Sequence, residues 1–84
     1  MYYTYVLQSE KDMKFYVGYT KNLKLRFEQH NKGNISSTKD RRPLKLMYYE
    51  ACLDPQDASK REKYLKTFNG RRFLQNRLKS YLTG

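Results

Sequence analysis

The chain has 84 residues and a formal net charge of +10, from 18 Lys and Arg against 8 Asp and Glu. Aromatic residues make up 15% of it, which excludes a disordered basic tail and indicates one folded basic domain spanning residues 1–84. A single Cys excludes an internal disulfide, and one Cys with one His excludes a structural zinc site built from these residue types.

The first two expected elements form a hairpin. Residues 2–8 are rich in aromatic and β-branched side chains and predict a strand, whose alternation places Tyr5 and Val6 on opposite faces. Residues 14–19 predict a second strand, paired with the first across a polar turn. Gly18 interrupts this strand, which indicates a bulge or a close approach of the backbone to another group.

A helix, a loop and a third strand follow. Asn22 is a helix-capping residue, and Gly33 marks the end of the helix that it starts. Leu23, Phe27 and His30 stand at positions i, i+4 and i+7, so they are expected to form one buried face of this helix. Residues 34–43 are polar and basic and predict a loop, and residues 44–51 predict the third strand.

Two helices close the chain. Asp54 followed by Pro55 predicts a helix start, and the pair Asn69-Gly70 predicts the end of that helix. Residues 71–81 predict a last helix. The order β-β-α-β-α-α describes an α+β fold, with a small, mostly antiparallel sheet of three strands flanked by helices.

Glu62 stands out because it falls in the apolar stripe of its helix, between Ala58 and Leu65. A carboxylate in such a stripe has to be paired or bound to a cation. One interpretation is a structural ion pair with a neighbour such as Arg61 or Lys66. The other is a metal ligand, because Mg²⁺ binds one or two carboxylates together with phosphate oxygens.

Arg26 and His30 lie one helical turn apart at the border of an apolar helix face. Arg26 either covers the edge of the core with its aliphatic stem or presents its planar guanidinium to a phosphate. His30 alone is typical of a hydrogen-bonded, partly buried histidine. Because His30 lies four positions after Arg26, both side chains are expected to project to the same region.

Nine tyrosines supply strand packing, and tyrosines also stack on nucleic-acid bases. Tyr5 and Tyr16 lie on paired strands and are expected to face each other across the hairpin. Composition alone does not separate these two from the others.

These residues resemble the signature of the GIY-YIG nuclease family over nearly the whole chain. The second family triplet is matched by Tyr16-Val17-Gly18, whereas Tyr3-Thr4-Tyr5 matches the first only in its final Tyr. The segment YVGYTKNLKLRFEQHNKG is similar to that of the N-terminal nuclease domain of excinuclease and of homing endonucleases in the family. Arg26 falls at the family's arginine, His30 at a histidine of some members, and Glu62 at its metal-binding glutamate.

The resemblance implies an endonuclease that hydrolyses DNA phosphodiester bonds, in DNA repair or recombination, with Mg²⁺ or alternatively Mn²⁺ as cofactor. Glu62 and water would hold the cation, and Arg26 would contact the phosphate. Tyr5 or Tyr16 would orient or deprotonate the attacking water, and which of the two is the base stays open. His30 would serve as an alternative base or as a hydrogen-bond relay.

Basic residues around these positions are candidates for phosphate contacts, which add affinity without reading sequence. They flank the first helix, fill the loop after it and surround Glu62: Lys21, Lys24, Lys39, Arg41, Arg42, Lys60, Arg61 and Lys63. The family also carries an asparagine beyond its glutamate, for which Asn69 and Asn76 are both candidates.

Two other interpretations use the same charge. One is a module that holds nucleic acid without cutting it, against which the set Tyr5, Tyr16, Arg26 and Glu62 speaks. The other is a small RNA-associated protein whose tyrosines stack on unpaired bases. For the nuclease, we expect a partner protein, a homodimer or the structure of the DNA to choose the target. The N-terminus lacks signal-peptide features and no window holds the roughly 18 apolar residues of a membrane span, which favours a cytoplasmic protein without membrane contact.

Overall fold

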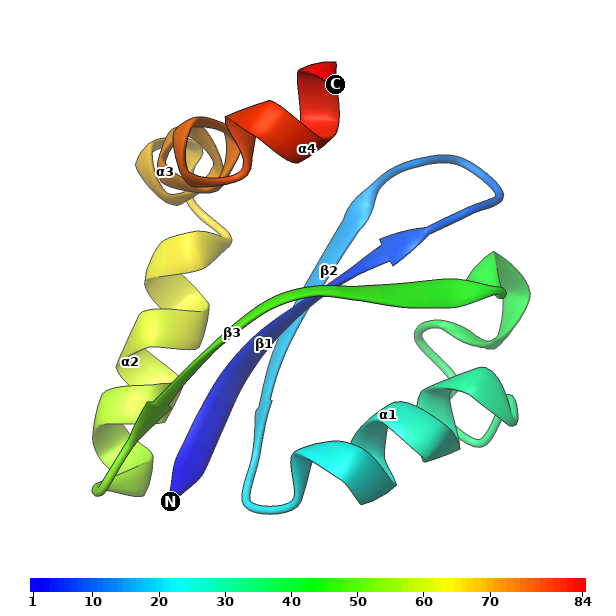
Figure 1. The fold of residues 1–84 in the computed structure, drawn as a ribbon. Coiled ribbons are helices and arrows are strands. Elements are labelled where there is room, and N and C mark those ends of the chain that lie inside the picture. The colour runs from blue at the N-terminus through cyan, green and yellow to red at the C-terminus, as the bar shows by residue number, and fades with distance from the viewer.

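The computed structural model describes residues 1–84 as an α+β fold, as the sequence predicts. Its strands are β1 (Tyr2–Ser9), β2 (Phe15–Thr20) and β3 (Leu44–Cys52). Its helices are α1 (Leu23–Asn31), α2 (Pro55–Leu65), α3 (Phe68–Arg77) and α4 (Lys79–Thr83), with a short 3-10 helix, η1 (Lys39–Arg41), before β3 (Figure 1).

The three strands form one antiparallel sheet in the order β2-β1-β3. Tyr5 on the central strand pairs with Gly18 of β2 and with Tyr49 of β3. The β1–β3 register shifts between Val6 and Leu7, and such an irregularity increases the local twist of the sheet. Because β1 has a neighbour on each side, it is the strand that carries the centre of the fold.

Helices cover both faces of the sheet, so alternate residues of β1 enter two separate cores (Figure 1). The first core lies between the sheet, α2 and α3, and consists of Val6, Val17, Leu65 and Leu74. The second lies under α1 and consists of Tyr5, Leu7 and Leu44, with Leu23 and Phe27 packed against it. The predicted alternation of Tyr5 and Val6 and the predicted buried face of α1 are therefore both confirmed.

The break between the last two predicted helices lies earlier than the sequence indicates. α2 ends at Leu65, and Thr67 caps α3 by accepting a hydrogen bond from the Gly70 N–H at 3.1 Å. Asn69 and Gly70, expected to end a helix, instead lie in the first turn of α3. A Cβ at residue 70 would overlap the Tyr64 carbonyl oxygen, so Gly70 allows α3 to cross closely over the end of α2.

The predicted last helix is likewise divided. Leu78 leaves the helical conformation with φ −105° and ψ 17°, and the five exposed residues of α4 follow it. None of the helices has the length and apolar character needed to cross a membrane.

Candidate active site

The phenol of Tyr5 is the centre of the candidate site. Its side chain is 1% exposed and lies over Gly18 of β2, where a Cβ would come within 2.6 Å of the hydroxyl oxygen. The glycine of the Tyr16-Val17-Gly18 triplet therefore makes room for the phenol. Of the two predicted explanations for Gly18 the close approach is correct, since the β1–β2 register runs without a bulge.

Two further rings contact Tyr5 on this face. The ring centroids of Tyr5 and Tyr16 are 6.5 Å apart, those of Tyr5 and His30 5.7 Å, and those of Tyr16 and His30 5.1 Å. Tyr16 pairs with Leu7, two residues along β1 from Tyr5, so the two tyrosines are diagonal neighbours on one face. β1, β2 and α1 thus each contribute one ring to the cluster.

His30 joins this cluster to the loop after α1. Its side chain is fully buried, with Nε2 2.9 Å from the Tyr5 hydroxyl oxygen and Nδ1 2.7 Å from Thr38 Oγ1. Thr38 is also fully buried. The sequence did not single out Thr38, because a threonine in a polar loop carries no signal of where its hydroxyl lies.

Burial sets the protonation of the two central groups. It lowers the pKa of His30 to about 4, with a further contribution from the charge of Arg26, so the imidazole is neutral at neutral pH. Burial also raises the pKa of the Tyr5 hydroxyl, against a smaller opposite effect of Arg26. Tyr5 consequently keeps its proton in the free protein, and its use as a base requires a route for that proton.

Arg26 and Glu62 act on Tyr5 from two different helices. Arg26, half-buried on α1, favours the ionised form of Tyr5, while the negative charge of Glu62 on α2 disfavours it. The charges of Arg26 and Glu62 thus both affect the pKa of the Tyr5 hydroxyl, in opposite directions. Neither residue shows this relation by its sequence position alone.

The Glu62 carboxylate is held in an ion pair. Its side chain is 16% exposed, and Oε2 lies 2.8 Å from Nζ of Lys66, which is 50% exposed. The structural ion pair expected as one interpretation is therefore present. Glu62 also suits Mg²⁺, which retains several waters and binds through one or two carboxylates. No cluster of three or more His, Cys, Asp or Glu offers a cage built from protein groups.

All three of the predicted phosphate-binding arginines have internal partners, and exposed Arg42 donates from Nε to the Lys39 carbonyl at 2.8 Å. Arg61 makes a two-pronged ion pair with Glu50 of β3, with Nε–Oε1 and Nη2–Oε2 distances of 3.0 Å each, and its guanidinium lies 4.6 Å from the Phe73 ring centroid. Arg41 donates to the Phe15 carbonyl at 3.3 Å. The remaining predicted basic residues are exposed: Lys21, Lys24, Lys39, Lys60 and Lys63.

The two candidate asparagines lie at opposite ends of α3, and both are exposed. Asn69 is in the first turn, close to the end of α2, which carries Glu62. Asn76 is in the last turn. Their assignment stays a prediction.

The sheet carries Tyr5 and Tyr16, and the helices α1 and α2 carry Arg26, His30 and Glu62, the residues that resemble the signature of a nuclease domain. Residues 1–77 match the model of the GIY-YIG catalytic domain, and the chain belongs to the GIY-YIG family. The members of this family are endonucleases that generally depend on a divalent metal.

Within this family the chain is similar to small proteins named UPF0213. It is 38% identical over 76 residues to a UPF0213 protein of Clostridium perfringens, covering 89% of this chain and 81% of that protein. It is 37% identical over 75 residues to one of Staphylococcus haemolyticus, covering 88% and 90%. The solution NMR structure of a UPF0213 protein from Bacillus halodurans matches with a TM-score of 0.56 and 26% identity, over 90% of this chain and 84% of that one.

Proposed function

We propose that this protein is a metal-dependent endonuclease that hydrolyses DNA phosphodiester bonds, acting in the cytoplasm in DNA repair or recombination. The observation that carries the proposal is the buried Tyr5–His30 pair, on which Arg26 and Glu62 act electrostatically. Hydrolysis of a phosphodiester needs a proton acceptor, a cation for the phosphate and a site for a metal. These residues supply one group for each need.

Arg26 and a metal held by Glu62 would neutralise the negative charge of the phosphate. Arg26 presents a planar guanidinium with only donors, which suits two non-bridging phosphate oxygens. Glu62 and water would hold the divalent cation, Mg²⁺ or Mn²⁺, once the exposed Lys66 ammonium moves away. A bound cation stabilises negative charge on the phosphate and on the leaving oxygen.

Tyr5 and His30 would remove a proton from the attacking water. A free Tyr5 phenolate is disfavoured, because burial raises the pKa of the hydroxyl. The neutral His30 imidazole lies 2.9 Å away, however, and offers an acceptor. We therefore infer that the water passes its proton to the Tyr5 oxygen as the Tyr5 proton passes to His30 Nε2. The water oxygen bonds to phosphorus, the bond to the leaving oxygen breaks, and that oxygen takes a proton from solvent.

DNA binding rests on exposed basic residues outside this cluster, in a chain with a net charge of +10. Phosphate contacts of this kind set affinity and orientation but read no base sequence. Choice of the target therefore falls to the structure of the DNA, to a second copy of the chain or to a partner protein.

The proposal is tested by incubating the protein with supercoiled plasmid in Mg²⁺, in Mn²⁺ and in a chelator. We expect nicking with a cation and none with the chelator. Glu62→Gln should abolish nicking and keep DNA binding, while Glu28→Gln on the exposed face of α1 should leave both unchanged. Tight binding without nicking in either cation would instead establish a binding module, and a strong preference for single-stranded RNA an RNA-associated protein.

A further inference from the structure

The hydroxyl of Thr38 lies against the nitrogen of His30 that faces away from Tyr5. Both side chains are fully buried, and the Nδ1–Oγ1 distance is 2.7 Å. A neutral imidazole has one N–H donor and one acceptor nitrogen, so its two partners have to play opposite roles. The role of Thr38 therefore determines which nitrogen is left to face Tyr5.

The surroundings of Tyr5 settle which assignment is favoured. A phenol is a stronger donor than an aliphatic alcohol, and the oxygen of the alcohol is the stronger acceptor. The Tyr5 hydroxyl has one hydrogen-bond partner, His30 Nε2. The buried Tyr5 O–H then needs an acceptor, and His30 Nε2 at 2.9 Å is the one that contacts it.

We propose that Thr38 is a positioning residue, which accepts the Nδ1–H of His30 and thereby keeps Nε2 unprotonated and aimed at the Tyr5 hydroxyl. This inference rests on the proposed nuclease function. With the other tautomer, Nε2 would carry a hydrogen and the proton of Tyr5 would have nowhere to go. Thr38 touches neither water nor phosphate in this scheme, and it acts through His30.

The loop that carries Thr38 is fixed at both ends. On one side, the amide of Asn31 donates to the Leu44 carbonyl at 3.2 Å and accepts from the Leu44 N–H at 3.0 Å, which joins the end of α1 to the start of β3. On the other, the Thr38 carbonyl accepts from the Arg41 N–H at 2.9 Å. The position of Arg41 therefore bears directly on that of Thr38.

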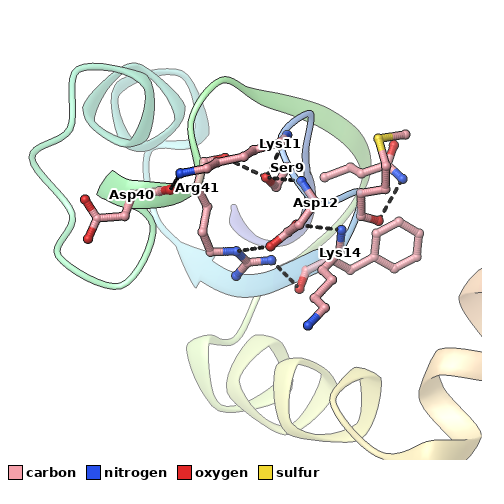
Figure 2. A network of polar contacts seen from close by, with 9 residues as sticks. Ser9, Lys11, Asp12, Lys14, Asp40 and Arg41 are labelled. Atoms are coloured by element: carbon pink, nitrogen blue, oxygen red, sulfur yellow. Dashed lines mark hydrogen bonds and ion pairs between the residues drawn. The ribbon is translucent and has the colours of Figure 1, made fainter.

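Arg41 is in turn attached to the β1–β2 hairpin, as Figure 2 shows. Its carbonyl accepts from Ser9 Oγ at 2.6 Å, and its guanidinium donates to the Phe15 carbonyl and lies 3.8 Å from the Asp12 carboxylate. Ser9 Oγ also accepts the N–H groups of the following turn. These contacts with the hairpin fix the position of η1 and therefore that of Thr38 in the free protein.

Two kinds of measurement test the inference. Nitrogen NMR of ¹⁵N-histidine-labelled, metal-free protein reads the tautomer of the only histidine directly, and we expect Nδ1 protonated and Nε2 bare. Thr38→Val should shift that tautomer equilibrium and slow single-turnover cleavage at least about tenfold, without change in DNA affinity. Thr38→Ser should restore both, and Ser37→Ala, an exposed hydroxyl of the same loop, should change neither.

A wild-type protein with Nε2 protonated would overturn the inference, and so would a folded Thr38→Val variant with the wild-type tautomer or cleavage rate. If Thr38→Val does not fold, the wild-type spectrum and Thr38→Ser still decide. If the wild-type protein does not cut DNA at all, the proposed function fails, and the tautomer measurement separates that result from a wrong role for Thr38 in the hydrogen-bonded chain.

Discussion

Lowering the pH from 7 to 5 should destabilise this protein through a single residue. His30 is the only histidine, it is fully buried, and burial together with the charge of Arg26 lowers its pKa to about 4. In the unfolded chain its pKa returns to about 6.5. The folded state therefore disfavours the proton, so stability is complete above about pH 6.5 and is lost as the pH falls towards 4.

The size of the effect follows from these two pKa values. A difference of about 2.5 corresponds to roughly 3 kcal/mol over the full range, of which about 2 kcal/mol falls between pH 7 and pH 5. Asp12 does not interfere, because the hydrogen bond from the Lys14 N–H lowers the pKa of its carboxyl below the ordinary 3.8. Its contribution is lost only at lower pH than this window.

Urea unfolding at pH 7, 6 and 5 measures the loss, with the slope in urea required to stay constant. His30→Gln provides the control, since its amide can replace both hydrogen bonds but does not titrate. We expect the wild-type free energy of unfolding to fall by about 2 kcal/mol while that of the variant stays nearly level. Equal pH dependence of the two proteins would refute a buried, neutral His30.

Arg26→Lys retains the charge and the aliphatic stem but not the planar fork, so single-turnover cleavage should slow by about 10²–10³-fold at unchanged Tm and DNA affinity; a wild-type rate would leave Arg26 as a residue that covers the core edge. Gly18→Ala places a methyl 2.6 Å from the Tyr5 hydroxyl oxygen and should lower the free energy of unfolding by about 1–3 kcal/mol, whereas unchanged stability would contradict the position of the phenol. The logarithm of the DNA binding constant should fall with the logarithm of salt concentration by about 0.9 per phosphate neutralised, and a flat response or strong preference for one short sequence would contradict electrostatic binding.

Local patterns predicted most of the fold. Asn22 caps α1 by accepting from the Leu25 N–H at 3.1 Å, and Asp54 followed by Pro55 starts α2, because both signals depend on a few neighbouring residues. The end of α2 was predicted wrongly, because Gly70 serves the contact between two helices. A glycine that ends a helix and one that lets another helix approach look alike in sequence.

In the candidate site, too, regular patterns predicted some of the neighbouring residues and missed others. The proximity of Tyr5 to Tyr16 was expected from strand pairing, and that of Arg26 to His30 from helix spacing, because both patterns are regular. The hydrogen bond between Tyr5 and His30 joins a strand to a helix and was not predicted. Thr38 could not be predicted either, since its position depends on an irregular loop held by Arg41 and the hairpin. Sequence likewise could not show that Arg61 pairs with Glu50, because the partners lie on different elements of the fold.

The most direct test of the proposed mechanism is single-turnover cleavage by Tyr5→Phe, which removes only the hydroxyl that we propose to link the attacking water to His30. Tyr19→Phe removes a hydroxyl from a tyrosine that is 44% exposed on β2 and serves as the matched control. We predict that Tyr5→Phe binds DNA normally and cuts about 10²–10⁴-fold more slowly with Mg²⁺, while Tyr19→Phe cuts at the wild-type rate. A folded Tyr5→Phe variant that cuts as fast as the wild type would contradict the assignment of this cluster as the catalytic centre.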